Sequence, residues 1–211
     1  ILVDTSPDMR AQLLDADVWQ VDAILFTHAH ADHVNGIDDI RTLNYHKGGA
    51  LDAFASAQTL DILQERFGYI FEPYRDVNPQ FWRPCLNPKV IDGPFMIGDI
   101  EIQPFAQEHG RMPSLGFRFG PFAYSTDVKT LPEEAFELLD GIEVWIVDAL
   151  SENPHPTHSH VDQTLDWITR VGSKRAVLTH LSHRTDYARL AARLPAGVEP
   201  GIDGMVIRIP E

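Results

Sequence analysis

The chain has only one cysteine, Cys85, and no long hydrophobic run. A lone cysteine cannot form an intrachain disulfide, so we expect a cytoplasmic protein in which Cys85 is a buried apolar residue. Apolar runs such as residues 23–26 are far shorter than the ~20 residues that span a bilayer, and we expect no membrane segment. Linkers, low-complexity tracts and repeats are also lacking, which predicts a single domain over residues 1–211.

Basic residues are scarce as well, with 17 Lys and Arg against 31 Asp and Glu and a formal net charge of −14 at pH 7. Long nucleic acids are bound by clustered Lys and Arg, so this charge disfavours a large polyanionic partner but not a small one. The contents of hydrophobic residues (44%) and charged residues (23%) are close to those of soluble globular proteins. The composition therefore predicts an ordinary folded domain, and any anionic partner is expected to be small.

Hydrophobic periodicity predicts an α/β protein. Strands are expected at residues 1–3, 23–27, 100–105, 115–119, 122–125, 144–147, 176–179 and 205–209, and helices at 8–16, 37–44, 57–68, 132–139, 161–171 and 186–194. The hairpin expected over residues 115–125, beside helix-separated strands, favours a sandwich of two mixed sheets with helices on the outer faces. Residues 1–3 resemble a strand already under way, so we expect the domain to lack its first N-terminal strands.

Residues 71–94 contain five prolines and are interpreted as an irregular excursion. A loop of this length inside a compact domain is more often functional than neutral. Its aromatic residues Phe71, Tyr74, Phe81 and Trp82 are candidates for a wall or lid over a base or sugar, with packing in the core as the alternative.

The most informative motif, His28-Ala29-His30-Ala31-Asp32-His33, follows directly on the expected strand 23–27. Side chains 28 and 30 can share a direction along the extended chain, while 32 and 33 turn toward a second site. Imidazole and carboxylate ligands suit Zn(II), Mn(II) or Fe(II), whereas calcium and magnesium sites are built mainly from oxygen ligands. The motif therefore predicts that one loop supplies ligands to two metal ions.

This motif resembles the histidine motif of the metallo-β-lactamase superfamily, and four further motifs fall in the family's order along the chain. They are Val3-Asp4, Gln107-Glu108-His109-Gly110, Tyr124-Ser125-Thr126-Asp127 and Leu178-Thr179-His180-Leu181. The resemblance implies the αββα metallo-β-lactamase fold, with Asp4 supporting the histidine loop. It also implies two divalent metal ions: one held by His28, His30 and His109, the other by Asp32, His33 and His180, and Asp127 shared between them. Two such ions activate a bridging water as the nucleophile.

The segment His155-Pro156-Thr157-His158-Ser159-His160 is similar to the phosphodiesterase branch of this superfamily, which contains tRNase Z and the PhnP-like phosphoribosyl cyclic phosphate phosphodiesterases. The resemblance implies hydrolysis of a small cyclic or nucleotide-like phosphate ester. His158 is the candidate general acid, and Asp32 is a further catalytic candidate as proton acceptor, although positioning a metal suits it better. His160 competes with His158 for the acid role and is otherwise expected to contact substrate, as are His183 and Arg184. A helix-capping turn with exposed histidines is the alternative for this segment.

Other functions use the same ligand set. Hydrolysis of a lactone, carboxylic ester or thioester is the alternative to phosphodiester cleavage, since the fold hosts all of these reactions. Processing of tRNA is disfavoured because the chain has no basic, Gly-rich arm, and a flavodiiron-like redox role is disfavoured because the metal loop has no glutamate. The metal is expected to be manganese or zinc, with iron as a third candidate, and a homodimer is compatible with the sequence.

Overall fold

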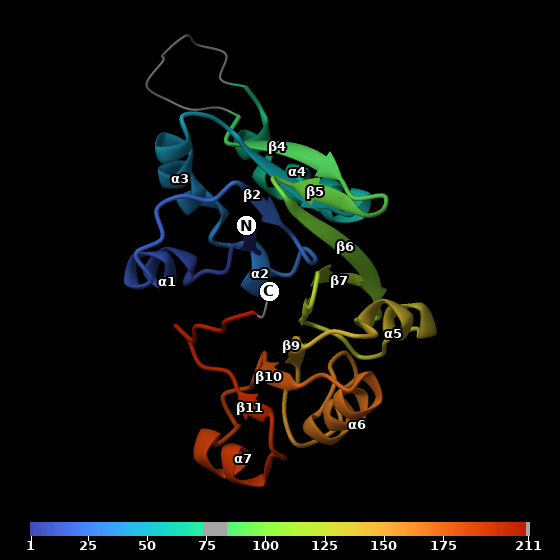
Figure 1. Ribbon diagram of the computed structural model, residues 1–211. Helices are drawn as coiled ribbons and strands as arrows, with labels where there is room; N and C mark the ends of the chain where they lie inside the picture. Colours follow the sequence, from blue (N-terminus) through green and yellow to red (C-terminus); the bar gives the residue numbers. More distant parts are fainter. Residues whose placement is uncertain (74–83, 210–211) are drawn as a thin grey trace. The chain divides into compact units, whose positions relative to one another are not determined.

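The computed structural model describes residues 1–73 and 84–209. The chain forms two compact units, Ile1–Gly93 and Pro94–Glu211. Each unit is built on its own β-sheet, accompanied by helices (Figure 1). The α/β class with two sheets is therefore confirmed.

The first unit contains a four-stranded sheet in the order β1-β2-β3-β4 in which every neighbouring pair is parallel. Residues Ile24, Ala53 and Pro88 are aligned across it. The continuous apolar run of β2 fits this sheet, because parallel strands are usually buried on both faces. The elements are β1 (Leu2–Val3), α1 (Met9–Asp15), β2 (Ala23–Leu25), α2 (Ala31–Val34), the 3-10 helix η1 (Ile37–Asp39), α3 (Ile40–Lys47), β3 (Leu51–Ala55), α4 (Ala57–Phe71) and β4 (Leu86–Val90).

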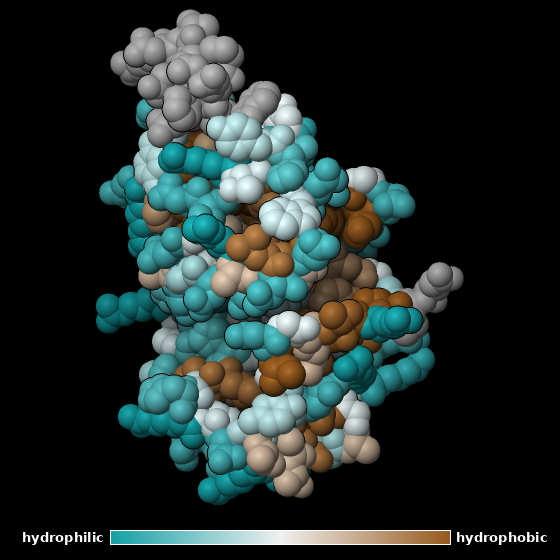
Figure 2. All heavy atoms as spheres, turned by 90° about the vertical axis from the view of Figure 1, so that its left-hand side faces the viewer, coloured by the Kyte–Doolittle hydropathy of each residue, from teal (hydrophilic) through white to brown (hydrophobic). Residues whose placement is uncertain are grey.

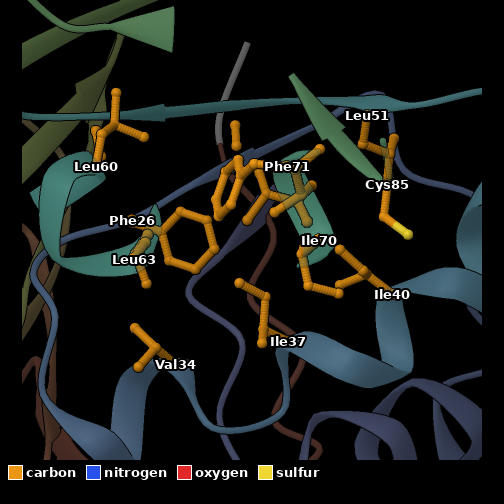
Figure 3. Packing of buried hydrophobic residues seen from close by; sticks show 14 of the residues in the cluster. Phe26, Val34, Ile37, Ile40, Leu51, Leu60, Leu63, Ile70, Phe71 and Cys85 are labelled. Atoms are coloured by element: carbon orange, nitrogen blue, oxygen red, sulfur yellow. The ribbon is translucent and has the colours of Figure 1, made fainter. Parts of the chain in front are cut away.

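A hydrophobic core fixes the end of β2. Phe26, which directly precedes Thr27 and His28, is fully buried and belongs to one cluster with Leu63 and Ile70 of α4 (Figure 3). Such dense packing leaves a side chain little freedom to move. The histidine loop therefore starts from a rigid strand end.

The second unit contains a seven-stranded mixed sheet in the order β11-β10-β9-β8-β7-β6-β5. The pairs from β5 to β8 are antiparallel, and those from β8 to β11 are parallel. The fully buried Trp145 anchors the core of this unit and donates its indole N–H to the Ser125 hydroxyl over 3.0 Å. The elements are β5 (Phe95–Ile97), β6 (Ile100–Gln107), β7 (Ser114–Phe119), β8 (Phe122–Ser125), α5 (Glu133–Leu139), β9 (Val144–Asp148), α6 (Val161–Val171), β10 (Arg175–Thr179), α7 (Tyr187–Arg193) and β11 (Val198–Pro200).

Several sequence expectations are corrected. The first sheet is parallel rather than mixed. Residues 205–209, expected to form a strand, do not form one. Val206 in this segment is 84% exposed, so its apolar side chain did not indicate burial in a sheet. The stretch 71–94, expected to be irregular, contains β4. Pro88 is tolerated in β4 because this strand lies at the edge of its sheet, where a missing backbone N–H leaves no partner unpaired.

The proposed aromatic wall is only partly tested. Phe71 packs in the core of the first unit (Figure 3), which is the alternative given for it. Tyr74, Phe81 and Trp82 lie outside the described residues. Cys85 is buried in the same core, as expected.

The described helices include none that is both long and apolar enough to cross a membrane. Large exposed hydrophobic residues, among them Trp19 and Tyr45, occur singly or in small groups. On the face shown in Figure 2, hydrophobic atoms likewise lie in small groups among hydrophilic ones.

Candidate metal centre

Three of the sequence-predicted site residues have a strained backbone. Among the described non-glycine residues, φ is positive at Asp4 (60°), Asp127 (52°) and His180 (57°), and otherwise at Asp17 in a surface turn. Each of the three lies at or just beyond the end of a strand, β1, β8 or β10. Such left-handed conformations cost about 1–3 kcal/mol each and concentrate at functional sites. The strained positions thus coincide with residues of the candidate site.

In the first unit, the histidines of the loop after β2 converge. His28 Nε2 and His30 Nδ1 are 2.8 Å apart, and the rings of His28 and His33 have their centroids 4.4 Å apart. His28 and His33 are buried, whereas Asp32 is exposed, with its Oδ2 3.6 Å from His33 Nε2. This unit thus brings together all four predicted ligands of the loop.

Asp4 holds this loop in place. Its Oδ1 accepts a hydrogen bond from the Thr27 backbone N–H over 2.8 Å, and its Oδ2 accepts from the Thr27 hydroxyl over 2.7 Å. The same Oδ2 is 2.7 Å from His33 Nδ1. Thr27 Oγ1 in turn lies 3.0 Å from His28 Nδ1 and can accept its proton, because the Thr27 hydrogen is donated to Asp4. The expected support of the histidine loop by Asp4 is confirmed.

A support that the sequence did not reveal comes from α4. Arg66 donates a hydrogen bond from Nη1 to the Ala29 carbonyl over 2.6 Å, between the two histidines of the motif. No signal in the sequence connected Arg66 with the loop.

In the second unit, Asp127 is the centre of a buried cluster. Its Oδ2 lies 3.4 Å from His109 Nε2, and its Oδ1 lies 3.2 Å from His180 Nε2. Each carboxylate oxygen therefore faces a different imidazole nitrogen. Asp127 could therefore contribute a carboxylate oxygen to a metal ion beside either histidine.

His158 belongs to the same cluster. Its ring stacks on that of His180 with centroids 4.7 Å apart, and its Nε2 lies 3.9 Å from Asp127 Oδ2. On its other side, Nδ1 is 3.0 Å from Asp148 Oδ2. His158 and His160 were the two candidates for the general acid, and of these His158 lies in the cluster.

Asp148 is a site residue that the sequence analysis missed. It is fully buried at the end of β9, and its Oδ2 also accepts the Val128 backbone N–H over 2.9 Å. Burial raises the pKa of the Asp148 carboxyl, while the hydrogen bond and charge of His158 act in the opposite direction. The signal that could have revealed it is its position, since Asp4 and Asp127 are also aspartates that follow apolar strands.

The residues that were predicted to contact substrate, His160, His183 and Arg184, lie on segments that flank β9 and β10 rather than in the Asp127 cluster. His160 is the N-cap residue of α6, and its buried Nδ1 has no hydrogen-bond partner among the described residues. His183 and Arg184 line a cavity with His155, whose ring centroid is 5.2 Å from that of His158. Burial lowers the pKa of His155, and the nearby His158 adds to this effect.

The available donors, imidazole nitrogens and carboxylate oxygens, fit a divalent metal ion. Metal-binding histidines usually have their second ring nitrogen held by a carboxylate, carbonyl or hydroxyl, which fixes the tautomer. Here the Nδ1 atoms of His28, His33 and His109 are held in this way, by Thr27, by Asp4 and by the Thr157 carbonyl at 2.7 Å. Their Nε2 atoms are thereby left as ligands, and Asp127, His158 and His180 could also share one ion, since their ligand atoms lie within 4.8 Å of one another.

The fold and these His/Asp clusters define the class of protein. A family model described as the "Beta-lactamase superfamily domain" matches residues 1–181, and the chain belongs to this superfamily. More particularly, it belongs to the PhnP family. The crystal structure described as a new diphosphatase from that family is 31% identical and has a TM-score of 0.87, over 96% of this chain and 76% of that one. The chain thus has the metallo-β-lactamase fold.

Two further similarities are less specific. The short form of human tRNase Z is 19% identical with a TM-score of 0.69, over 99% of this chain and 88% of that one, which shows a shared fold. The octanoyltransferase of Porphyromonas gingivalis (strain ATCC BAA-308 / W83) is 35% identical over 215 residues, which is 100% of this chain but 42% of that protein. The chain spans less than half the length of this curated relative.

Proposed function

We propose that this protein hydrolyses small phosphodiesters, including cyclic and nucleotide-like ones, with His158 as the general acid. The observation that carries the proposal is the orientation of His158. Its Nδ1 is held by Asp148 at 3.0 Å, while its Nε2 points toward Asp127 at 3.9 Å. An imidazole fixed in this way can deliver a proton from Nε2 to a leaving oxygen, which is the role of a general acid.

The proposed metal ligands come from both units. His28, His30, Asp32 and His33 belong to the first unit, and His109, Asp127 and His180 belong to the second. We propose that they bind two ions of manganese, zinc or iron, as the resemblance to the superfamily implies. When bound, such ions supply an activated water and neutralise negative charge on the phosphate.

The remaining roles fall to residues of the second unit. Asp148 positions His158 and stabilises its protonated form. His183 and Arg184 are proposed contacts of substrate phosphate, because both are exposed at one cavity and a guanidinium matches phosphate oxygens. His160 is a weaker proposal, given its place as the N-cap residue of α6. The solved relative is a diphosphatase, and cleavage of a diphosphate requires the same attack at phosphorus.

The net charge of −14 supports a small substrate, since long nucleic acid would be repelled. A cytoplasmic location and a homodimer remain proposals. The name of the octanoyltransferase belongs to a protein more than twice as long and is not carried over.

The test compares three chromogenic substrates, namely bis(4-nitrophenyl) phosphate, 4-nitrophenyl acetate and a lactone, with protein loaded separately with Mn(II) and Zn(II). We expect turnover of the phosphodiester and a loss of roughly 10²–10⁴-fold in kcat for His158→Ala. His46→Ala, which removes an exposed histidine of α3, is the matched control. Metal content is measured for each variant, to separate loss of the acid from loss of the metals. Ester or lactone turnover that is indifferent to His158, without phosphodiester turnover, would overturn the proposal.

A further inference from the structure

The ends of β6 and β7 carry two buried polar side chains that contact the turn after β8. Gln107 ends β6 and Ser114 begins β7, and the two residues are paired across these antiparallel strands. Each residue is only 2% exposed. Glutamine and serine are mostly found at the surface, and where they are buried their hydrogen bonds usually account for it. The hydrogen bonds of this pair therefore indicate what it does.

These hydrogen bonds reach the two peptide groups that flank Asp127. Gln107 Nε2 donates to the Thr126 carbonyl over 2.9 Å. Ser114 Oγ donates to the Asp127 carbonyl over 2.7 Å, and it accepts a hydrogen bond from Gln107 Nε2 over 3.1 Å. The first carbonyl belongs to the peptide plane before the Asp127 Cα, and the second belongs to the plane after it. Both planes that define φ and ψ of Asp127 are therefore held.

Asp127 needs such support because its backbone is strained. Its φ of 52° lies in the left-handed region, which residues other than glycine seldom occupy and which persists only where the surrounding structure enforces it. The Thr126 hydroxyl donates to Asp127 Oδ1 over 2.8 Å and so also restrains the carboxylate. The backbone and the side chain of Asp127 are thus both held from within the second unit.

Stability does not account for the glutamine. Gln107 Oε1 is buried and has no hydrogen-bond partner among residues 1–73 and 84–209, and a buried acceptor without a partner destabilises the folded state. Gly116 provides the space for this oxygen, since a Cβ at that position would lie 2.7 Å from it. An apolar side chain of similar size would fill position 107 without burying such an oxygen. Local departures of this kind are typical of functional sites.

We propose that Gln107 and Ser114 are positioning residues that hold Asp127 in its strained conformation and thereby set the metal affinity of the centre. One carboxylate oxygen of Asp127 lies 3.4 Å from His109 Nε2, and the other lies 3.2 Å from His180 Nε2. A rotation of the Asp127 backbone would therefore displace both oxygens from these histidines. This inference rests on the proposed function for the assignment of Asp127 as a ligand of both ions.

The experiment measures metal binding and stability separately in Gln107→Met and Ser114→Ala. Dissociation constants for Zn(II) come from competition with a fluorescent chelator, and the stability of the metal-free protein comes from urea unfolding. Loss of a group that orients a metal ligand typically lowers metal affinity about 10–100-fold, so we expect both Zn(II) equivalents to bind about tenfold more weakly or worse in each variant. Gln107→Met should change the unfolding midpoint little, because it removes the buried Oε1 while it deprives the Thr126 carbonyl of its donor.

Ser125→Ala is the matched control. It removes a buried hydroxyl of the same unit, which accepts the Trp145 indole N–H over 3.0 Å, and it leaves both contacts with the Asp127 peptide groups in place. We expect a less stable protein with wild-type Zn(II) affinity, which is the reverse of the result for Gln107→Met. The visible absorption spectrum of bound Co(II) depends on ligand geometry, so it should change in Gln107→Met and stay the same in Ser125→Ala.

Wild-type Zn(II) affinity in Gln107→Met and Ser114→Ala, or an equal loss of affinity in Ser125→Ala, would overturn the inference and leave the proposed function standing. A wild-type protein that binds no Zn(II) would overturn both. If the two variants bind Zn(II) more weakly but the wild-type protein hydrolyses no phosphodiester, the proposed function fails while the positioning role is upheld. Should Gln107→Met fail to fold, Ser114→Ala gives the same test, because it removes the other contact.

Discussion

Replacing Asp4 by asparagine should weaken metal binding while leaving the fold in place. The Thr27 backbone N–H can only donate, so the asparagine must keep its carbonyl oxygen at the position of Asp4 Oδ1, which accepts that N–H at 2.8 Å. The amide nitrogen, a donor, then replaces Oδ2 beside His33 Nδ1. His33 must accept there, and its proton moves to Nε2, the nitrogen that we propose as the metal ligand.

The expected magnitude follows from these contacts. Losing the hydrogen bond to a charged carboxylate should lower the free energy of unfolding of the metal-free protein by about 1.5–3 kcal/mol. Removing a partner that orients a ligating histidine typically lowers metal affinity about 10–100-fold. The Thr27 hydroxyl also loses Oδ2 as its acceptor, so its hydrogen can turn toward His28 Nδ1. We therefore expect metal to bind about 10–100-fold more weakly in Asp4→Asn, with the larger loss at the ion held by His33.

The assay is competition with a fluorescent zinc chelator, combined with elemental analysis and urea unfolding of the metal-free protein. Asp61→Asn makes the same charge change at an exposed position of α4 and serves as the control. Wild-type affinity at both sites in a folded Asp4→Asn protein would refute the reasoning, because it would mean that Asp4 does not set the tautomer of a ligating His33.

Two further predictions concern stability. Gly116→Ala should destabilise the protein by about 1–3 kcal/mol in urea unfolding, because the added Cβ would lie 2.2 Å from the ring of the buried Phe105. Gly93→Ala is the control, since its added Cβ meets no atom within 4 Å. Equal unfolding midpoints for the two variants would contradict the packing of Gly116 in β7. Removal of metal with a chelator should lower the midpoint temperature of thermal unfolding, and added Mn(II) or Zn(II) should restore it. The reason is that a ligand that binds only the folded state stabilises that state by mass action. A midpoint temperature unaffected by both treatments would contradict the proposed metal sites.

Local sequence patterns predicted much of the fold, but not all of it. The amphipathic helices α4 and α6 and the apolar strands β2 and β9 were predictable because their periodicity marks which side is buried. Four strands were missed: β3 and β4 in the first unit, and β5 and β11 in the second. Pro88 in β4, and the three-residue lengths of β5 and β11, give too weak a local signal, since backbone pairing with a neighbouring strand determines such segments.

The chemistry available to this protein could be read from its motifs. The His28–His33 motif and its companion motifs, in order, identified the superfamily and the candidate ligands, because metal binding requires those residue types. The groups that support these ligands became visible only in the folded chain. It showed that Asp4 holds Thr27 and His33, that Asp148 holds His158 rather than His160, and that Arg66 reaches the Ala29 carbonyl. These partners lie between 10 and 37 positions apart in the chain. Hydrogen bonds over such separations produce no periodic pattern in the sequence, because they form only when the sheets are assembled.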